Sequence, residues 1–142
     1  MSQPVPAIRP LQWAIAFVAM AGAASALEGI WYLDVAEPLY QREIGRLLNV
    51  EFDGFVAILF YLVYALGALV FALRPALRSG RWQQAAGLGA LYGFFCFSAH
   101  NLTDLADVRG YTATIAAVDI AWGVCMSAAA SSLAFLASRR LG

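Results

Sequence analysis

Long apolar stretches alternate with short polar segments along this chain. Each stretch holds roughly 20 or more residues and is long enough to cross about 30 Å of hydrocarbon as an α-helix. The connections after the second and third stretches are short, so neighbouring helices must pack antiparallel. The pattern predicts an all-α integral membrane fold, an antiparallel bundle of four transmembrane helices in one domain covering residues 1–142. The predicted helices cover about residues 11–33, 52–73, 82–106 and 111–137.

The connection between the first two helices is the longest one. Within it, Pro38–Leu48 has Tyr40, Ile44 and Leu47 on one side of a helix and mainly Gln and Arg on the other. We expect a short amphipathic interfacial helix here, with Pro38 in its first turn. Such a helix is either a plain connector, which we favour, or a lid over a membrane site.

Composition agrees with this interpretation, because 62% of the residues are hydrophobic and only 13% are charged. The apolar run near the N-terminus also fits a cleaved signal peptide that ends near Ala24 and Ala26. We favour a retained helix, because Glu28 and Trp31 beyond that point have counterparts, Asp119 and Trp122, in the last helix.

Arginine distribution predicts the orientation, since the chain contains no Lys. One side carries more Arg residues than the other and should be cytoplasmic. We therefore expect a multi-pass protein of the bacterial inner (plasma) membrane with cytoplasmic N- and C-termini. The cytoplasmic set is Arg9, Arg74, Arg78, Arg81, Arg139 and Arg140, and the outer set is Arg42, Arg46 and Arg109.

Several kinds of chemistry are excluded by residues that the chain lacks. Without Lys it cannot form a retinal Schiff base, and with a single His it cannot by itself provide two histidine ligands to a haem. No glycine-rich phosphate loop, zinc-ligand spacing or basic patch for nucleic acid is present. We predict no metal, no cofactor and no nucleic-acid partner.

Three acids lie inside the apolar stretches and form the predicted catalytic set. In the expected topology, Glu28 and Asp104 lie within about 6 to 9 Å of the outer ends of their helices, and Asp119 about 10 Å from the start of its own. Facing lipid would cost each of them a few kcal/mol, so they should turn inward and meet in one polar cluster in the outer half. Carboxylates that close together should share protons.

Polar and aromatic neighbours of these acids are the predicted ligand-binding residues. Spacings of three and four residues let the third helix present His100, Asn101 and Asp104 towards one sector. Glu28 and Asp119 are each followed three residues later by Trp, so each acid should have its own indole beside it as a hydrogen-bond donor. Tyr61 and Tyr64 are included, with packing as the alternative. The ligand-binding set is Trp31, Tyr61, Tyr64, His100, Asn101, Thr103 and Trp122.

Small residues recur four positions apart on three of the helices, as Gly22 with Ala26, Gly89 with Gly93 and Ser127 with Ser131. This spacing allows membrane helices to approach closely. We expect these faces to be helix contacts, without chemistry of their own.

Four segments together resemble one family of bacterial membrane proteins. They are residues 39–45 (LYQREIG), 60–67 (FYLVYALG), 101–106 (NLTDLA) and 118–123 (VDIAWG). The chain resembles the predicted membrane proteins called domain of unknown function 2177, from the first helix to the last. The resemblance implies a four-helix inner-membrane protein without an assigned activity.

This chain departs from the family pattern at three positions of the predicted site. Members usually have Asp where Glu28 stands, an aromatic residue at His100, and Asp then Asn where this chain has Asn101 then Asp104. The exchange moves the carboxylate by one helical turn on the same face. A histidine that the family does not require is a poor candidate for an essential base, so the carboxylates rank above His100.

Three functions remain open. The first is a membrane-embedded binding protein or enzyme for a lipid or isoprenoid-like molecule, with acid-base chemistry at Glu28, Asp104 and Asp119. The second is a proton-coupled transporter or channel for a small solute, because buried acids also suit proton relays. The third is an accessory subunit whose small-residue faces contact a homo-oligomer or a larger membrane complex. A polar network that only holds the helices together is the non-functional alternative.

Overall fold

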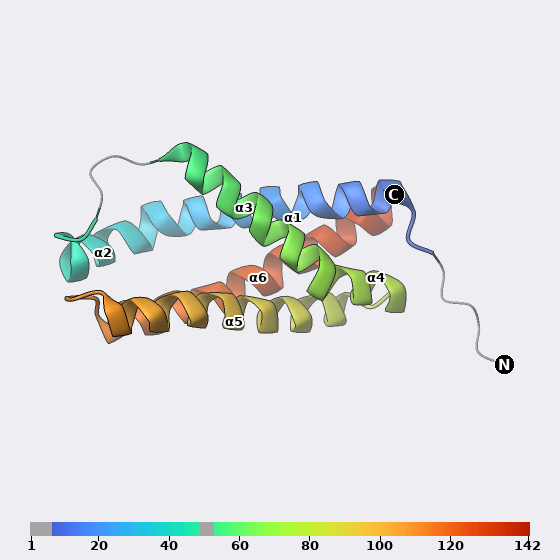
Figure 1. Ribbon diagram of the computed structural model, residues 1–142. Helices are drawn as coiled ribbons and strands as arrows, with labels where there is room; N and C mark the ends of the chain where they lie inside the picture. Colours follow the sequence, from blue (N-terminus) through green and yellow to red (C-terminus); the bar gives the residue numbers. More distant parts are fainter. Residues whose placement is uncertain (1–6, 49–52) are drawn as a thin grey trace.

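The computed structural model describes residues 7–48 and 53–142, and this part of the chain is entirely helical apart from short connections (Figure 1). A first long helix contains α1 (Pro10–Trp31), the π-helical turn η1 (Tyr32–Ala36) and α2 (Glu37–Ile44). A second contains α3 (Gly54–Ala68), the π-helical turn η2 (Leu69–Leu73) and α4 (Arg74–Ser79). The remaining two are α5 (Trp82–Asp107) and α6 (Ala113–Leu141).

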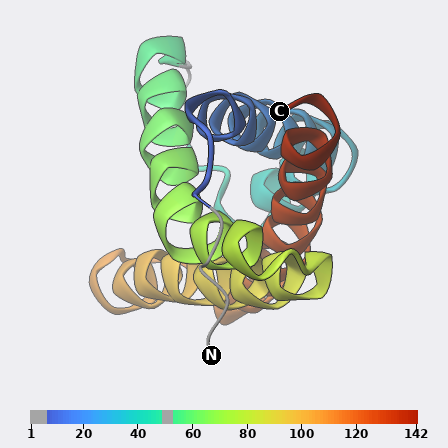
Figure 2. The same cartoon turned by 90° about the vertical axis from the view of Figure 1, so that its right-hand side faces the viewer.

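The helices form an antiparallel bundle in which α6 contacts both α1 and α5 (Figures 1 and 2). The α3 helix crosses on the other side, contacting α1 and, through η2, α5. The start of α1 and the end of α6 lie at the same end of the molecule. The opposite end gathers α2, the end of α5 and the start of α6, which is where the polar residues meet.

Three helices are long and apolar enough to cross a membrane: Pro10–Ile44, Gly54–Ser79 and Ala113–Leu141. Large apolar side chains on their outer faces support this assignment, since Phe55 is 76% and Phe71 67% exposed. These three helices correspond to the first, second and fourth predicted spans. The third corresponds to α5, which has 26 residues but includes Gln83, Gln84, Asn101 and Asp104. Its insertion stays a prediction.

Both π-helical turns lie just before a proline. A proline in a helix lacks an N–H group, and its ring collides with the carbonyl four residues earlier. For Pro38 that carbonyl belongs to Asp34, in the middle of η1, and for Pro75 it belongs to Phe71, in the middle of η2. The wider π turn moves the carbonyl away from the ring, because its hydrogen bonds run to the residue five positions on. Each proline therefore explains its π turn.

The expected helix at Pro38–Leu48 is present as α2, but it ends at Ile44 and is continuous with α1 through η1. It is therefore an extension of the first helix, because η1 makes room for the Pro38 ring and the chain stays helical on both sides of it. Residue 52, the first of the second predicted span, lies outside the described residues. The end of that span continues through η2 and α4 to Ser79.

The close contact between α5 and α6 uses the small residues that the sequence indicated. A Cβ atom added at Gly89 would lie 2.5 Å from Ser131 Oγ, and one added at Gly93 would overlap Ser127. The two helices approach through these positions because neither glycine has a side chain to separate them. The expected role of Gly89 with Gly93 and of Ser127 with Ser131 is confirmed. A Cβ atom added at Gly22 would meet no atom of the described residues within 4 Å, so the Gly22 and Ala26 pair makes no such close contact.

Candidate functional site

Asp119 lies at the centre of a hydrogen-bonded cluster between three parts of the chain. Its side chain is buried, with 7% of the residue exposed. The Tyr40 hydroxyl donates to its Oδ1 at 2.8 Å, and Asn101 Nδ2 donates to its Oδ2 at 2.6 Å. Each carboxylate oxygen thus has a neutral donor, one from α2 and one from α5. These donors satisfy a group whose burial would otherwise be costly.

The π-helical turn η1 brings Tyr40 to this position. Twelve residues separate Glu28 from Tyr40, which in a regular α-helix would place Tyr40 about 120° around the axis from Glu28. A π turn holds one residue more, so the two positions fall within about 20° of each other. Pro38, through η1, therefore sets Tyr40 on the face that contacts α6.

A second tyrosine completes a chain of hydrogen bonds through Asn101. The Tyr111 hydroxyl, from the turn before α6, donates to Asn101 Oδ1 at 2.6 Å. The Asn101 amide also donates to the Phe97 carbonyl at 3.0 Å and is completely buried. The order is Tyr111, Asn101, Asp119, Tyr40, with a partly buried phenol at each end. Such a chain can transmit a change in the charge of Asp119 to both phenols.

Glu28 and the two tryptophans form the neighbouring part of the cluster. Trp122 Nε1 donates to Glu28 Oε2 at 2.8 Å, and the rings of Trp31 and Trp122 stack with centroids 4.5 Å apart and planes 5° from parallel. The prediction that each acid has the indole of its own helix is therefore wrong. An indole is long enough to reach across to the next helix, so Trp122 on α6 serves the acid on α1. Trp31 Nε1 is buried without a hydrogen-bond partner in the described part of the chain.

The predicted single sector on α5 is divided into two faces. Asn101 faces α6, whereas His100 Nδ1 pairs with Asp104 Oδ2 at 3.2 Å on the outer side, with side chains 63% and 29% exposed. Successive residues lie about 100° apart on a helix, so His100 and Asn101 cannot face the same way. The Thr103 hydroxyl donates to the Ala99 carbonyl of its own helix at 2.7 Å and is exposed. Asp104, His100 and Thr103 thus form no hydrogen bond with Asp119 or Glu28 in the described residues.

Tyr61 and Tyr64 belong to the packed interior of the bundle. Tyr64 is buried and hydrogen-bonds the Ser127 hydroxyl, and Tyr61 packs edge to face with Phe60. Both lie against the apolar core, and neither forms a hydrogen bond with Glu28 or Asp119 in the part of the chain that the structure describes. Their contacts fit the packing role that was the alternative.

A family model described as a predicted membrane protein (DUF2177) matches residues 13–136, from the start of α1 nearly to the end of α6. The chain belongs to this family. No curated protein and no solved structure matches it. The family is described as a predicted membrane protein, and its description names no activity. The function of this DUF2177 protein must therefore be inferred from the Asp119 cluster.

Two residues of the cluster were not predicted as site residues, Tyr40 and Tyr111. Tyr40 stood on the apolar side of the amphipathic segment, and Tyr111 was the first residue of a predicted span, so each had a structural explanation. The signal for Tyr40 was its place inside one of the four family-like segments, LYQREIG.

Within residues 7–48 and 53–142 of this DUF2177 protein, no group of three His, Cys, Asp or Glu residues could hold a metal ion.

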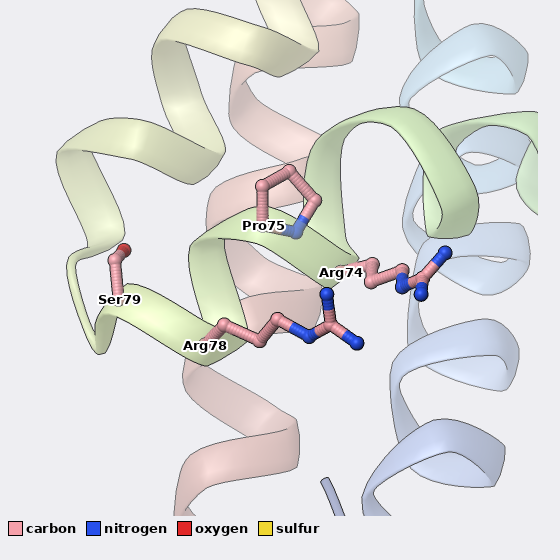
Figure 3. Close-up of a pocket in the computed structure, with 4 residues that line it drawn as sticks. All are labelled: Arg74, Pro75, Arg78 and Ser79. Carbon is pink, nitrogen blue, oxygen red and sulfur yellow. The ribbon is translucent and has the colours of Figure 1, made fainter. Parts of the chain in front are cut away.

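Two depressions lie at opposite ends of the DUF2177 bundle. One, of about 560 Å³, is on α4, where the Arg74 and Arg78 side chains extend in the same direction (Figure 3). The other, of about 690 Å³, lies between the segment that follows Tyr40 and the turn that precedes Tyr111. It is lined by Gln41, Arg42, Glu43, Ile44, Gly45, Arg46, Leu47, Arg109 and Gly110.

Proposed function

We propose that this membrane protein binds the polar end of a lipid or isoprenoid-like molecule at the Asp119 cluster and exchanges a proton with it through that carboxylate. The observation that carries the proposal is the environment of Asp119, which is buried yet, among the described residues, held only by neutral donors from Tyr40 and Asn101. A carboxylate without a cationic partner can accept and release a proton more readily than one held in an ion pair.

The position of the cluster supports a ligand that is itself in the membrane. It lies at one end of the bundle, and its Tyr40 and Tyr111 are next in sequence to residues that line the depression between α2 and the α5–α6 turn. A lipid headgroup is found at this level of a membrane, and aromatic side chains such as Trp31 and Trp122 are favoured there. Asp119 is the proposed acid-base group, and Glu28, held by Trp122, is the second carboxylate of the site.

The alternative to this proposal is that the hydrogen bonds of the cluster only hold the helices together. Hydrogen bonds between membrane helices contribute around 0.6 kcal/mol each, and an amide or hydroxyl at position 119 would provide them without burying a carboxylate. The presence of two acids, Glu28 and Asp119, in one cluster favours chemistry that requires a carboxylate. Asp104 pairs with His100 outside this network, and we assign it no step.

The first experiment compares membrane lipid extracts by untargeted mass spectrometry. The samples are cells that express the wild type, Asp119→Asn or Asp104→Asn, and cells without the protein. We expect at least one lipid species to change with the wild type and with Asp104→Asn, but not with Asp119→Asn. Four matching profiles would contradict the proposal, and so would a wild-type profile from Asp119→Asn.

We also propose that α5 is a fourth span and that both termini are cytoplasmic. The arginine distribution supports this orientation, and the start of α1 lies at the same end of the bundle as the end of α6. A cysteine introduced at Gly110 should react with an impermeant thiol reagent added outside spheroplasts, whereas one introduced at Gly142 should react only after lysis. A cysteine at Gly80, before α5, that reacts on the same side as the one at Gly110 would remove the fourth span, and the reverse pattern, with Gly80 and Gly142 reactive from outside, would invert the orientation.

A further inference from the structure

The depression beside the cluster has a composition that matches a specific headgroup chemistry. Three of its lining residues are arginines, Arg42 and Arg46 from one wall and Arg109 from the other. The lining also contains Glu43, whose Oε1 lies 3.2 Å from Arg42 Nε. Three guanidinium groups against one carboxylate leave a formal excess of two positive charges.

Its two walls meet closely although they are far apart in the sequence. A Cβ atom at Gly110, which has a φ of +93°, would lie 4.0 Å from Leu47 Cδ1. The α5–α6 turn therefore packs against the segment after α2, and Arg46 and Arg109 stand on opposite sides of the contact. Leu47 is itself half exposed, so an apolar surface adjoins the charged one.

Arg46 and Arg109 are the arginines of this depression that can bind an anionic ligand. In residues 7–48 and 53–142, neither Arg46 nor Arg109 has a carboxylate within ion-pair distance, and both are exposed. Planar guanidinium groups match the oxygens of a phosphate in paired hydrogen bonds, which is why arginine is favoured at phosphate sites. Two such groups on facing walls can hold one phosphate between them.

We infer that this groove binds the phosphate of a membrane lipid, with Arg46 and Arg109 as its main contacts and Arg42 at its edge. The inference rests on the proposed function and names its ligand class, a phosphate-bearing lipid. Tyr40 directly precedes the groove residue Gln41, and Tyr111 directly follows Gly110. A phosphate held by the arginines would therefore lie next to the two chain segments that carry these phenols.

The test measures lipid binding to the purified full-length protein in detergent, by native mass spectrometry and by titration. The probes are dioctanoyl phosphatidic acid, dioctanoyl glycerol, which lacks the phosphate, and inorganic phosphate. The variants are Arg46→Gln with Arg109→Gln, and the matched pair Arg74→Gln with Arg78→Gln in the depression at the other end (Figure 3). Circular dichroism and thermal unfolding establish that each variant is folded.

We expect the Arg46/Arg109 pair to weaken phosphatidic acid binding at least about tenfold, and the Arg74/Arg78 pair to change it less than about twofold. Equal losses in both pairs, or equal binding of dioctanoyl glycerol, would overturn the inference. Inorganic phosphate that competes as well as the lipid would also overturn it, because the site would then recognise free phosphate.

This outcome is separable from that of the proposed function. If the Arg46/Arg109 pair binds normally while Asp119→Asn alters the lipid extract, only the groove inference fails. If the pair loses binding while Asp119→Asn leaves the extract at the wild-type profile, only the acid-base function fails.

Discussion

The hydroxyl of Tyr40 donates a 2.8 Å hydrogen bond to Asp119, which lies 79 positions further along the chain. This contact joins the end of the first helix to the start of the last one. Of the three acids predicted to form the cluster, Asp119 is the buried one, and Tyr40 and Asn101 donate to its two oxygens. Among residues 7–48 and 53–142 it forms no ion pair.

Replacement of Tyr40 by Phe should destabilise the protein by about 0.5 to 1.5 kcal/mol, because the variant keeps the ring and removes only the donor to a buried carboxylate. Thermal unfolding in detergent is the measurement. Tyr32→Phe is the matched control, since Tyr32 is 45% exposed and forms no side-chain hydrogen bond in the described part of the chain. Equal effects of the two variants would show that the Tyr40 bond adds nothing to stability.

Pro38→Ala should uncouple Tyr40 from Asp119 without touching either side chain. The change removes the ring that requires η1, so the helix can return to regular α-helical geometry and turn Tyr40 about 100° away from α6. A double-mutant cycle between Tyr40→Phe and Asp119→Asn measures the coupling directly. We expect a coupling energy in the wild-type background and its loss in the Pro38→Ala background.

Pro75→Ala provides the control for this cycle, because η2 has the same relation to Pro75 but lies away from the cluster. It should leave the coupling between Tyr40 and Asp119 intact. Coupling that survives Pro38→Ala would mean that η1 does not depend on the proline.

The two stacked tryptophans should respond differently to replacement by Phe. Trp122→Phe removes the donor to the partly buried Glu28 and should cost about 0.5 to 1.5 kcal/mol, the usual contribution of one hydrogen bond. Trp31→Phe loses ring area but no hydrogen bond in the described structure, so its loss should be smaller. Denaturation of both variants under one set of detergent conditions gives the comparison, and an equal or reversed order would contradict the assigned Trp122–Glu28 bond.

Gly93→Ala should disrupt the contact between α5 and α6, since the new methyl group would overlap Ser127. Overpacking of this kind costs typically 1 to 3 kcal/mol. Gly87→Ala is the matched substitution on the same helix, with nothing within 4 Å of the added atom. It should be neutral or stabilise the helix slightly, because Ala has the higher helix propensity. Melting temperatures of the two variants test this, and a Gly93→Ala variant as stable as the wild type would refute the close approach.

Hydropathy was sufficient to predict the helices and their antiparallel order, because both depend on the length of the apolar stretches and of the connections. The third predicted helix, 82–106, differs from α5 by one residue at its C-terminal end. The first and second predicted helices end earlier than the observed ones, at 33 and 73. In both cases the chain continues as helix through a π turn and a proline, which sequence rules treat as a stop.

The sequence predicted how far along the bundle each site residue lies better than it predicted which way each side chain faces around its helix. Glu28, Asn101, Asp119, Trp31 and Trp122 meet at one end of the bundle, as their distances from the helix ends implied. Whether a residue faces inward depends on rotation about the axis, and spacings of three and four residues leave that ambiguous by about 100°. Asp104 and His100 were assigned inward for this reason. Tyr40 was missed because its direction depends on one additional residue in η1.

The additional residue in η1 also determines where this chain can tolerate the deletion of a residue. A π turn contains one residue more than the α-helical turn it replaces. A variant that lacks Val35 and carries Pro38→Ala would have eleven steps from Glu28 to Tyr40 in a regular α-helix, and Tyr40 would still face Asp119. Deletions in proteins are usually confined to surface loops. Here the interior of the longest helix, at Tyr32–Ala36, is a position where the chain can lose a residue and keep its register.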